Sequence, residues 1–93
     1  MNDISELMLC ERLKCLSCTT RREILLLTNK SVLTIRDISE SLNMEQITIK
    51  RHVKILMDCE FLSQNRTKNI ISYVANYKNL LDTIRVLESK LNQ

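Results

Sequence analysis

The chain has 93 residues, of which 44% are apolar and 27% are charged, and its formal net charge at pH 7 is +3. A chain of this length and composition forms one small globular domain, and no apolar run approaches the roughly 18 residues that a membrane-spanning helix needs. The acidic start, MNDISE, argues against a signal peptide, so we expect an intracellular protein without a membrane partner. The absence of glycine and proline favours a helix-rich fold with few strong helix breakers.

A first helix is predicted over residues 4–16. Asp3 and Glu6 have the spacing of an N-cap pair, and the segment that follows carries an apolar side made of Leu9, Leu13 and Leu16. The opposite side is apolar as well and carries Ile4, Met8 and Cys15. A helix with two apolar sides needs two partners to bury both, and a second copy of the chain is one candidate.

Capping boxes are predicted to open the next two helices. One pairs Thr20 with Glu23 in TTRREILLLTNK. The other pairs Thr34 with Asp37 and opens the helix IRDISESL, which follows Thr34 and runs to about residue 42. In such a box the threonine hydroxyl and the acidic side chain each accept a hydrogen bond from a free N–H group of the first turn. We expect a short strand at residues 31–33 between the two helices.

The segment TIKRHVKIL, residues 48–56, predicts a helix with two different sides. At about 100° per residue, one side collects the apolar residues Ile49, Val53 and Leu56. The other side collects the cations Lys50, Arg51 and Lys54, and the start of the helix adds Gln46, Ile47 and Thr48. The first side would hold the helix to the domain, and the second would face outward.

Positive charge is concentrated between residues 46 and 78. This segment has six lysines and arginines against two acidic residues, so its net charge is +4 and the rest of the chain carries −1. A localised basic segment is expected of a protein that contacts phosphate groups, although a charged run is more often a solvated face.

Two β-prone runs, FLSQNR and IISYVA, predict a hairpin. They are joined at Thr67, Lys68 and Asn69, and we expect Asn69 to supply any positive φ that the turn requires. Arg66 and Lys68 would then lie at the tip. The final segment predicts a helix whose apolar residues recur at the spacing of two helices packed together, at Tyr77, Leu80, Ile84, Leu87 and Leu91.

Two short helices, a tight turn and a hairpin with a basic tip are the layout of a winged helix-turn-helix. The stretch LKCLSCTTRREILLLT resembles the opening helices of ArsR-like repressors, and TIRDISESLNMEQITIKRHVKILMDCEFLSQNRT resembles their helix-turn-helix. The likeness covers roughly residues 13–75 and is carried by Leu42, Thr48, Arg51, His52, Lys54 and Leu56. Small winged-helix proteins from viruses of thermophilic archaea are similar too.

The resemblance implies a transcription regulator that binds double-stranded DNA as a homodimer, with a mostly α fold and a small antiparallel hairpin. Its single domain, residues 1–93, would comprise dimerisation helices at 4–16 and 76–91, a helix-turn-helix at 34–58 and a wing at 61–75. The residues implied in DNA contact are Gln46, Ile47, Thr48, Lys50, Arg51, Lys54, Arg66 and Lys68, and those implied in the dimer interface are Ile4, Met8, Tyr77, Leu80, Ile84, Leu87 and Leu91. No cofactor and no small-molecule effector is expected.

Two departures from the family pattern matter. The metal-sensing members carry C-x-C where this chain has Thr34, Ile35 and Arg36, so the sequence predicts no metal site of that kind. The family's A-G before the wing is Cys59 and Glu60 here. Because this bend lacks its glycine, we expect mild backbone strain at Glu60.

The four cysteines lack the paired C-x-x-C elements of a zinc ribbon. Cys59 is predicted to be a packed thiol. Disulfides are unusual inside cells, except in hyperthermophiles. If one forms, a cysteine on a dimerising helix can meet its own copy across a two-fold axis, which makes Cys10 and Cys15 the candidates, with Cys10 preferred.

Several other residues have a purely structural interpretation besides a functional one. His52 is expected to be packed and hydrogen-bonded rather than a ligand or a base. Ile47 could touch a thymine methyl or be an ordinary exposed apolar residue. Arg21 and Arg22 could contact phosphate from the start of a helix or form a solvated pair.

Three functions are compatible with these features. DNA binding is favoured, a winged helix used as a protein-binding or assembly module is the main competitor, and a redox or metal sensor built on Cys10, Cys15 and Cys18 is the third. Steep salt dependence of binding to duplex DNA separates the first from the second. Catalysis is rejected, because the sequence has no glycine for a phosphate loop and no second histidine.

Overall fold

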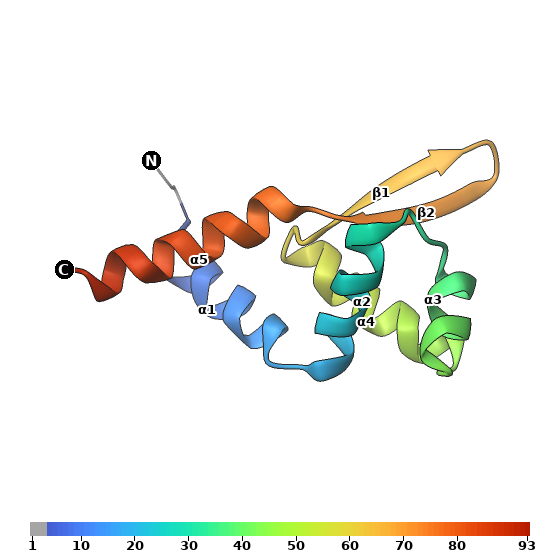
Figure 1. Ribbon diagram of the computed structural model, residues 1–93, viewed down its shortest axis with the longest axis horizontal. Coiled ribbons are helices and arrows are strands. Elements are labelled where there is room, and N and C mark those ends of the chain that lie inside the picture. The colour runs from blue at the N-terminus through green and yellow to red at the C-terminus, as the bar shows by residue number, and fades with distance from the viewer. Residues whose placement is uncertain (1–3) are drawn as a thin grey trace.

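Residues 4–93 are described by a computed structural model, in which five α-helices accompany one antiparallel β-hairpin. The elements are α1 (Glu6–Leu16), α2 (Thr19–Lys30), α3 (Ile35–Leu42), α4 (Gln46–Asp58), β1 (Leu62–Thr67), β2 (Ile70–Ala75) and α5 (Tyr77–Leu91). Figure 1 shows α2, α3 and α4 grouped below the hairpin, while α5 leads away to the opposite end, where it contacts α1. The predicted fold class is confirmed. None of the described helices is long and apolar enough to cross a membrane.

The caps of the first two helices differ from the predicted ones. Ser5 is the N-cap of α1, and its hydroxyl accepts a hydrogen bond from the Met8 N–H at 3.1 Å. Asp3, the predicted cap, lies outside the described residues. The N-cap of α2 is Cys18 and makes no side-chain bond, so the predicted box of Thr20 and Glu23 is wrong, because Thr20 already lies inside the first turn.

The capping box of α3 is confirmed. Thr34 Oγ1 accepts from the Asp37 N–H at 3.1 Å, and Asp37 Oδ2 accepts from the Thr34 N–H at 3.0 Å. The hydrogen bond from the Thr34 N–H lowers the pKa of the Asp37 carboxyl, because it stabilises the charged form. The helix ends at Asn43, which takes the left-handed conformation with φ 53° and so starts the turn into α4. Asparagine tolerates this conformation better than most residues, which suits a tight turn made without glycine.

The predicted strand at residues 31–33 is reduced to a single bridge. Leu33 alone pairs with Tyr73 of β2, through hydrogen bonds of 3.0 Å from the Leu33 N–H and 2.7 Å from the Tyr73 N–H. This bridge fastens the segment between α2 and α3 to the base of the hairpin.

The hairpin joins β1 and β2 in a register that runs from Leu62 opposite Ala75 to Thr67 opposite Ile70. Only two residues remain for the loop. Lys68 has the positive φ, 56°, so the prediction that Asn69 would supply it is wrong. Both common two-residue hairpin turns require positive φ at the first central residue, which is why Lys68 and not Asn69 alone adopts it.

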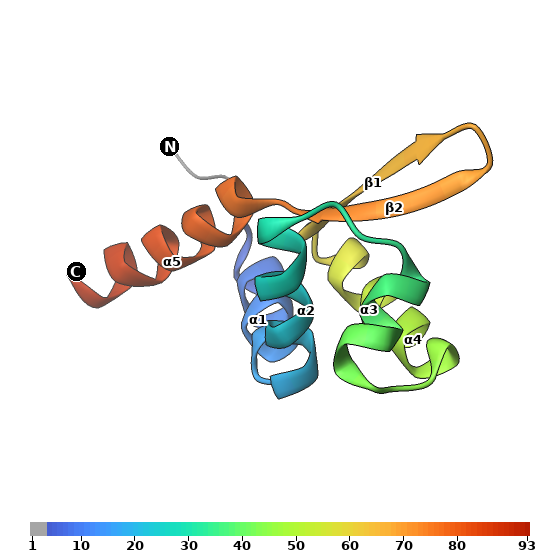
Figure 2. The ribbon, with the colours of Figure 1, turned by 45° about the vertical axis from the view of Figure 1, so that its right-hand side comes forward.

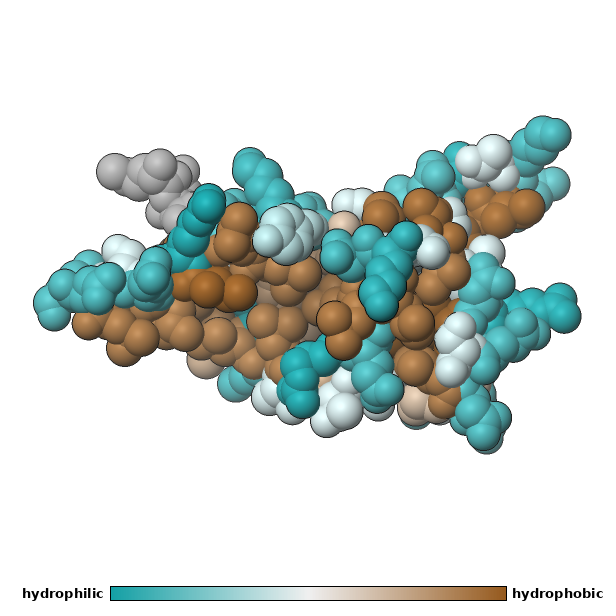
Figure 3. Space-filling model, viewed as in Figure 1, coloured by the Kyte–Doolittle hydropathy of each residue, from teal (hydrophilic) through white to brown (hydrophobic). Residues whose placement is uncertain are grey.

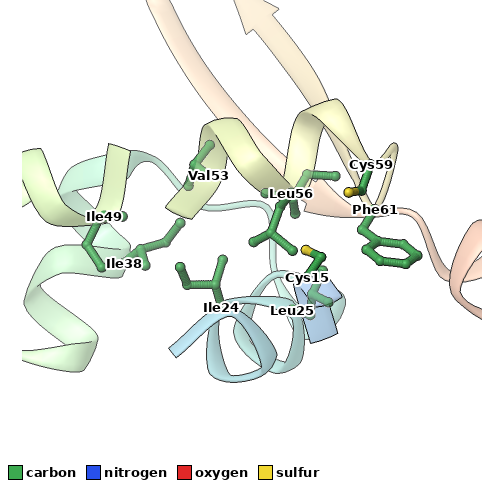
Figure 4. Packing of buried hydrophobic residues seen from close by; sticks show 10 residues of the cluster. Cys15, Ile24, Leu25, Ile38, Ile49, Val53, Leu56, Cys59 and Phe61 are labelled. Carbon is green, nitrogen blue, oxygen red and sulfur yellow. The ribbon is translucent and has the colours of Figure 1, made fainter. Parts of the chain in front are cut away.

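The core lies between α4 and the helices behind it. Figure 4 shows side chains from α2, α3 and α4 converging with Cys15 of α1 and Phe61 of the segment before β1. The apolar side of α4 is buried as predicted, since Ile49, Val53 and Leu56 all belong to this cluster. The strain expected at Glu60 is also confirmed: it has φ 63°, in the left-handed region.

Candidate nucleic-acid interface

The outward side of α4 is basic and open. Gln46, Ile47, Lys50, Arg51 and Lys54 are exposed, whereas Thr48 is half-buried. Within residues 4–93, neither Lys50 nor Arg51 forms an ion pair. The Lys54 ammonium lies 3.4 Å from Asp58 Oδ2 one turn later, but both side chains are exposed, so this pair is weak and open to exchange. The arrangement can present cations and hydrogen-bond donors to an anionic surface.

The wing, residues 61–75, adds a second basic element at the same end of the molecule. In the two ribbon views, the hairpin tip and the start of α4 lie at the end opposite to the last turn of α5 (Figures 1 and 2). Arg66 and Lys68 are exposed, and the part of the chain that the structure describes gives neither an ion pair. The structure therefore places the two predicted groups of DNA-contact residues toward the same end of the molecule.

Arg21 and Arg22 have a role that sequence reasoning missed. Arg21 donates from Nε to the Cys15 carbonyl at 2.8 Å, and Arg22 donates from Nη1 to the Leu16 carbonyl at 2.7 Å. Both guanidinium groups therefore cap the end of α1, where the last carbonyls have no partner within the helix. They are not a free solvated pair. Contact of the exposed Arg22 with phosphate stays a prediction.

His52 is the packed, hydrogen-bonded residue that the sequence predicts. Its Nδ1 lies 3.3 Å from Nη1 of Arg21, and its side chain is half-buried between α4 and α2. Because the guanidinium can only donate, Nδ1 is the acceptor. Burial and, second, the positive charge of Arg21 lower the pKa of His52.

Cys15 and Cys59 share the core, but the four cysteines do not form a metal site. All four are free thiols, and no group of three or more histidine, cysteine or acidic side chains within residues 4–93 could hold a metal ion. Cys59 is packed as predicted, with its Sγ donating to the Glu11 carbonyl at 3.8 Å. Burial raises the pKa of the Cys15 thiol to about 12. Cys15 is only 2% exposed, which argues against it as an interchain bridge, whereas Cys10 is exposed. The bridge itself stays a prediction.

The buried side of α1 combines residues from the two predicted apolar sides. The structure buries Leu9, Arg12 and Cys15, and leaves Leu7 and Leu13 exposed. Ile4 and Met8, two predicted interface residues, are half-buried. Apolar residues on both sides of a helix leave its rotation undetermined by periodicity alone, and a buried arginine was not anticipated.

The apolar residues of α5 remain uncovered. Figure 3 shows a broad apolar surface over the end of the molecule formed by α5 and α1. Leu80 packs against the core, but the other four predicted interface residues are 36 to 76% exposed: Tyr77, Ile84, Leu87 and Leu91. Regularly spaced apolar side chains that stay exposed mark a surface for another protein chain.

The hairpin, the short helix pair and the basic outward side of α4 define a winged helix-turn-helix DNA-binding protein. Residues 18–64 match the family described as bacterial regulatory protein, arsR family. The transcriptional repressor SdpR of Bacillus subtilis (strain 168) is 34% identical over 80 residues, which make up 86% of this chain and 89% of the relative. The chain therefore belongs to the ArsR family, whose members are transcriptional regulators that bind DNA.

Solved structures agree with this assignment. An ArsR-like transcriptional regulator from Rhodococcus sp. RHA1 has a TM-score of 0.83 at 25% identity, over 89% of this chain and 78% of that one. NolR from Sinorhizobium fredii has a TM-score of 0.76 at 16% identity, over 96% and 95% of the two chains, and shows the likeness of fold.

Proposed function

We propose that the protein binds specific sequences of double-stranded DNA as a homodimer, with the outward side of α4 reading bases and the wing contacting the sugar-phosphate backbone. The observation that carries the proposal is the division of α4 into two sides. One is buried in the core, and the other presents cations that have no strong partner within the described chain. Membership of a family of transcriptional regulators supports the proposal.

Base reading is assigned to the start and the outer side of α4. An α-helix fits the major groove, where arginine and lysine recognise guanine, and glutamine recognises adenine. Gln46, Lys50, Arg51 and Lys54 offer these side chains on successive turns. Ile47, exposed at the first turn, suits contact with a thymine methyl.

Backbone contact is assigned to the wing. Arg66 and Lys68 stand at or next to a tight loop whose neighbouring residues are all exposed. Cations on such a hairpin reach phosphates or the minor groove and add affinity for DNA of any sequence.

Self-association is assigned to α1 and α5. The exposed apolar residues of α5, with Leu7 and Leu13 of α1, would be covered by the same surface of a second copy. A two-fold dimer places two copies of α4 for two half-sites, which predicts an operator of inverted repeats whose centres are roughly one helical turn or a multiple apart.

Selection of bound sequences from random DNA, followed by affinity measurements on the selected and a scrambled duplex, tests this function. Arg51→Ala should weaken the selected duplex by about 1 to 3 kcal/mol and relax preference at one base pair of each half-site. Lys30→Ala is the control, because Lys30 is also an exposed helical cation without an ion pair in the described chain, but it lies at the end of α2, away from both α4 and the proposed dimer surface.

Two results would contradict the assignment. Retained DNA affinity in a folded variant with Lys50, Arg51 and Lys54 all changed to alanine would show that α4 is not the reader. Absence of salt-dependent DNA binding in the wild type would favour the protein-binding alternative. Intracellular action and an origin in a virus of thermophilic archaea stay predictions.

A further inference from the structure

Arg12 is a buried charge in the middle of α1. It is 5% exposed, its Nη1 donates to Thr83 Oγ1 of α5 at 3.1 Å, and its Nη2 lies 3.9 Å from Glu60 Oε2. Its Cζ lies 5.5 Å from the centre of the Phe61 ring, while its Nε is buried without a partner in residues 4–93. Arginine is rarely buried unless it is paired, because removing its charge from water is costly. A leucine could fill the same space without this cost.

The contacts of Arg12 form part of a closed ring of four residues. The Thr83 hydroxyl accepts from Arg12 and donates to the Asn79 carbonyl at 2.8 Å. Asn79 Nδ2 donates to the Glu60 carbonyl at 2.8 Å, and the Glu60 carboxylate faces Arg12 again. The ring joins α1, two successive turns of α5 and the corner between α4 and β1.

That corner is where a non-glycine residue is held in the left-handed region. Glu60 has φ 63°, and it separates the end of α4 from the start of the wing. A Cβ makes this conformation unfavourable, so it persists only where surrounding contacts determine it. Asn79 holds the Glu60 carbonyl, and the Asn76 N–H donates to the adjacent Phe61 carbonyl at 2.8 Å. The end of α4 holds the corner as well, since the Glu60 N–H donates to the Met57 carbonyl and the Phe61 N–H to the Leu56 carbonyl, both at 2.9 Å. The corner is therefore determined jointly by α4 and the start of α5.

We infer that the ring of Arg12, Glu60, Asn79 and Thr83 fixes the orientation of α1 and α5 relative to α4 and the wing, which makes Arg12 and Thr83 positioning residues for DNA binding. The inference rests on the proposed function, in which α1 and α5 join the two copies and α4 reads DNA. A dimer that engages two half-sites at once gains affinity only if the distance between its reading helices matches the distance between the half-sites. A rigid corner sets that distance.

The ring could instead serve only the stability of one chain, and the two possibilities predict different behaviour. Loss of stability alone reduces the amount of folded protein and lowers affinity for all DNA equally. A loosened corner leaves each reading helix intact, but it reduces the gain from engaging two half-sites and broadens the range of half-site spacings that the dimer accepts.

Thr83→Val is the sharpest test, because it keeps the side-chain shape and removes the hydroxyl that joins Arg12 to Asn79. Thr28→Val is its matched control: both threonines are 0% exposed, but the Thr28 hydroxyl donates only within α2, to the Ile24 carbonyl at 2.7 Å and the Leu25 carbonyl at 3.4 Å. Affinity should be measured for a single half-site and for paired half-sites whose separation changes by one base pair at a time, at protein concentrations where the variants are folded.

We expect Thr83→Val to keep single half-site affinity within about twofold and to lose about tenfold on the best-spaced pair, with a broader spacing profile. The Thr28→Val profile should match that of the wild type. Without DNA, hydrogen exchange at the Asn76 amide, which donates to the Phe61 carbonyl, should accelerate in Thr83→Val only.

Asn79→Ala is the second variant in case Thr83→Val does not fold, since it removes the bond to the Glu60 carbonyl and leaves Arg12 paired with Thr83. A spacing profile as sharp as that of the wild type in every folded ring variant would overturn the inference alone. A wild type that binds no DNA would overturn the proposed function and the inference with it.

Discussion

Arg21 Nη1 lies 3.3 Å from His52 Nδ1, so the first turn of α2 is tied directly to the middle of α4. Arg21 also holds the Cys15 carbonyl, and one guanidinium thus connects three helices behind the outward side of α4. Hydrogen bonds from a charged donor are stronger than neutral ones, and this one orients the imidazole. The position of α4 therefore depends on an arginine that the sequence suggested for phosphate.

The protein should lose stability as the pH falls below about 6.5. Burial and the charge of Arg21 place the folded-state pKa of His52 below its ordinary value of 6.5, so the unfolded chain takes up the proton first. The contribution of neutral His52 is fully present above the ordinary pKa and is lost as the pH falls through the lowered one. Urea unfolding between about pH 8 and pH 5 measures it. His52→Gln should reduce the dependence of the free energy of unfolding on pH. The same pH dependence in the wild type and the variant would contradict the prediction.

The two sides of α4 should respond differently to truncation. Leu56 is fully buried, so Leu56→Ala should lower the free energy of unfolding by about 2 to 5 kcal/mol. Lys50→Ala, on the exposed side, should change it by less than about 0.5 kcal/mol and should instead reduce affinity for the selected duplex. Chemical denaturation and DNA titration of both variants separate the effects. Equal losses of stability would show that the two sides are not distinct.

Removing a wing cation should weaken binding to all DNA sequences alike. Each phosphate contact releases counterions, so Arg66→Ala or Lys68→Ala should lower the slope of log affinity against log salt by about one unit per lost contact in each subunit. Titrations of selected and scrambled duplexes at several salt concentrations check this. A change in sequence preference with an unaltered salt slope would place these side chains on base edges.

Oxidation should join two chains through Cys10 if the exposed side of α1 lies at the two-fold axis. Cys10 is exposed, whereas Cys15 is buried and its pKa is raised to about 12, which leaves little reactive thiolate. A non-reducing gel of oxidised protein should show a dimer that Cys10→Ser abolishes and Cys15→Ser preserves. A dimer band that survives Cys10→Ser would assign the bridge to another thiol.

Glu60→Gly should stabilise the protein by about 1 kcal/mol, because glycine accepts the left-handed conformation without steric cost. Loss of the carboxylate that faces the buried Arg12 opposes this gain, but solvent screens the pair, because the Glu60 side chain is 62% exposed and lies 3.9 Å from the guanidinium. Asn43→Gly is the comparison: Asn43 also has positive φ, but asparagine tolerates it, so the gain there should be smaller. Thermal unfolding measures both, and a destabilised Glu60→Gly protein would mean that the contact with Arg12 outweighs the strain.

Periodicity predicted the helices and the buried side of α4 because these features are local. The spacing of Ile49, Val53 and Leu56 determines a side of a helix, and the pair of Thr34 and Asp37 determines its start. Thr20 and Glu23 have a similar spacing, yet α2 begins earlier at Thr19. A three-residue spacing cannot by itself distinguish a cap from the first turn of a helix.

Contacts between distant parts of the chain were not predictable in this way. Arg12 and Thr83 are 71 residues apart, and neither has a local pattern that indicates the other. The capping of α1 by Arg21 and Arg22 likewise depends on how α2 folds back on α1. The exposed cations of α4 and the wing could be predicted, because the charge and the helical spacing of residues are visible in the sequence. The hydrogen bonds behind them could be found only from the folded structure.

The bridge between Leu33 and Tyr73 also determines which edge of the hairpin is open. The apolar strand β2 has β1 along one edge, and Leu33 covers its other edge at Tyr73, near the base of the hairpin. The outer edge of β1 has no such bridge in the described chain, and its residues after Leu62 are the polar SQNRT. Unpaired strand edges are sites of aggregation, and natural proteins protect them with polar and charged side chains. The outer edge of β1 therefore offers polar side chains to neighbouring molecules instead of an apolar strand, which favours solubility at high concentration.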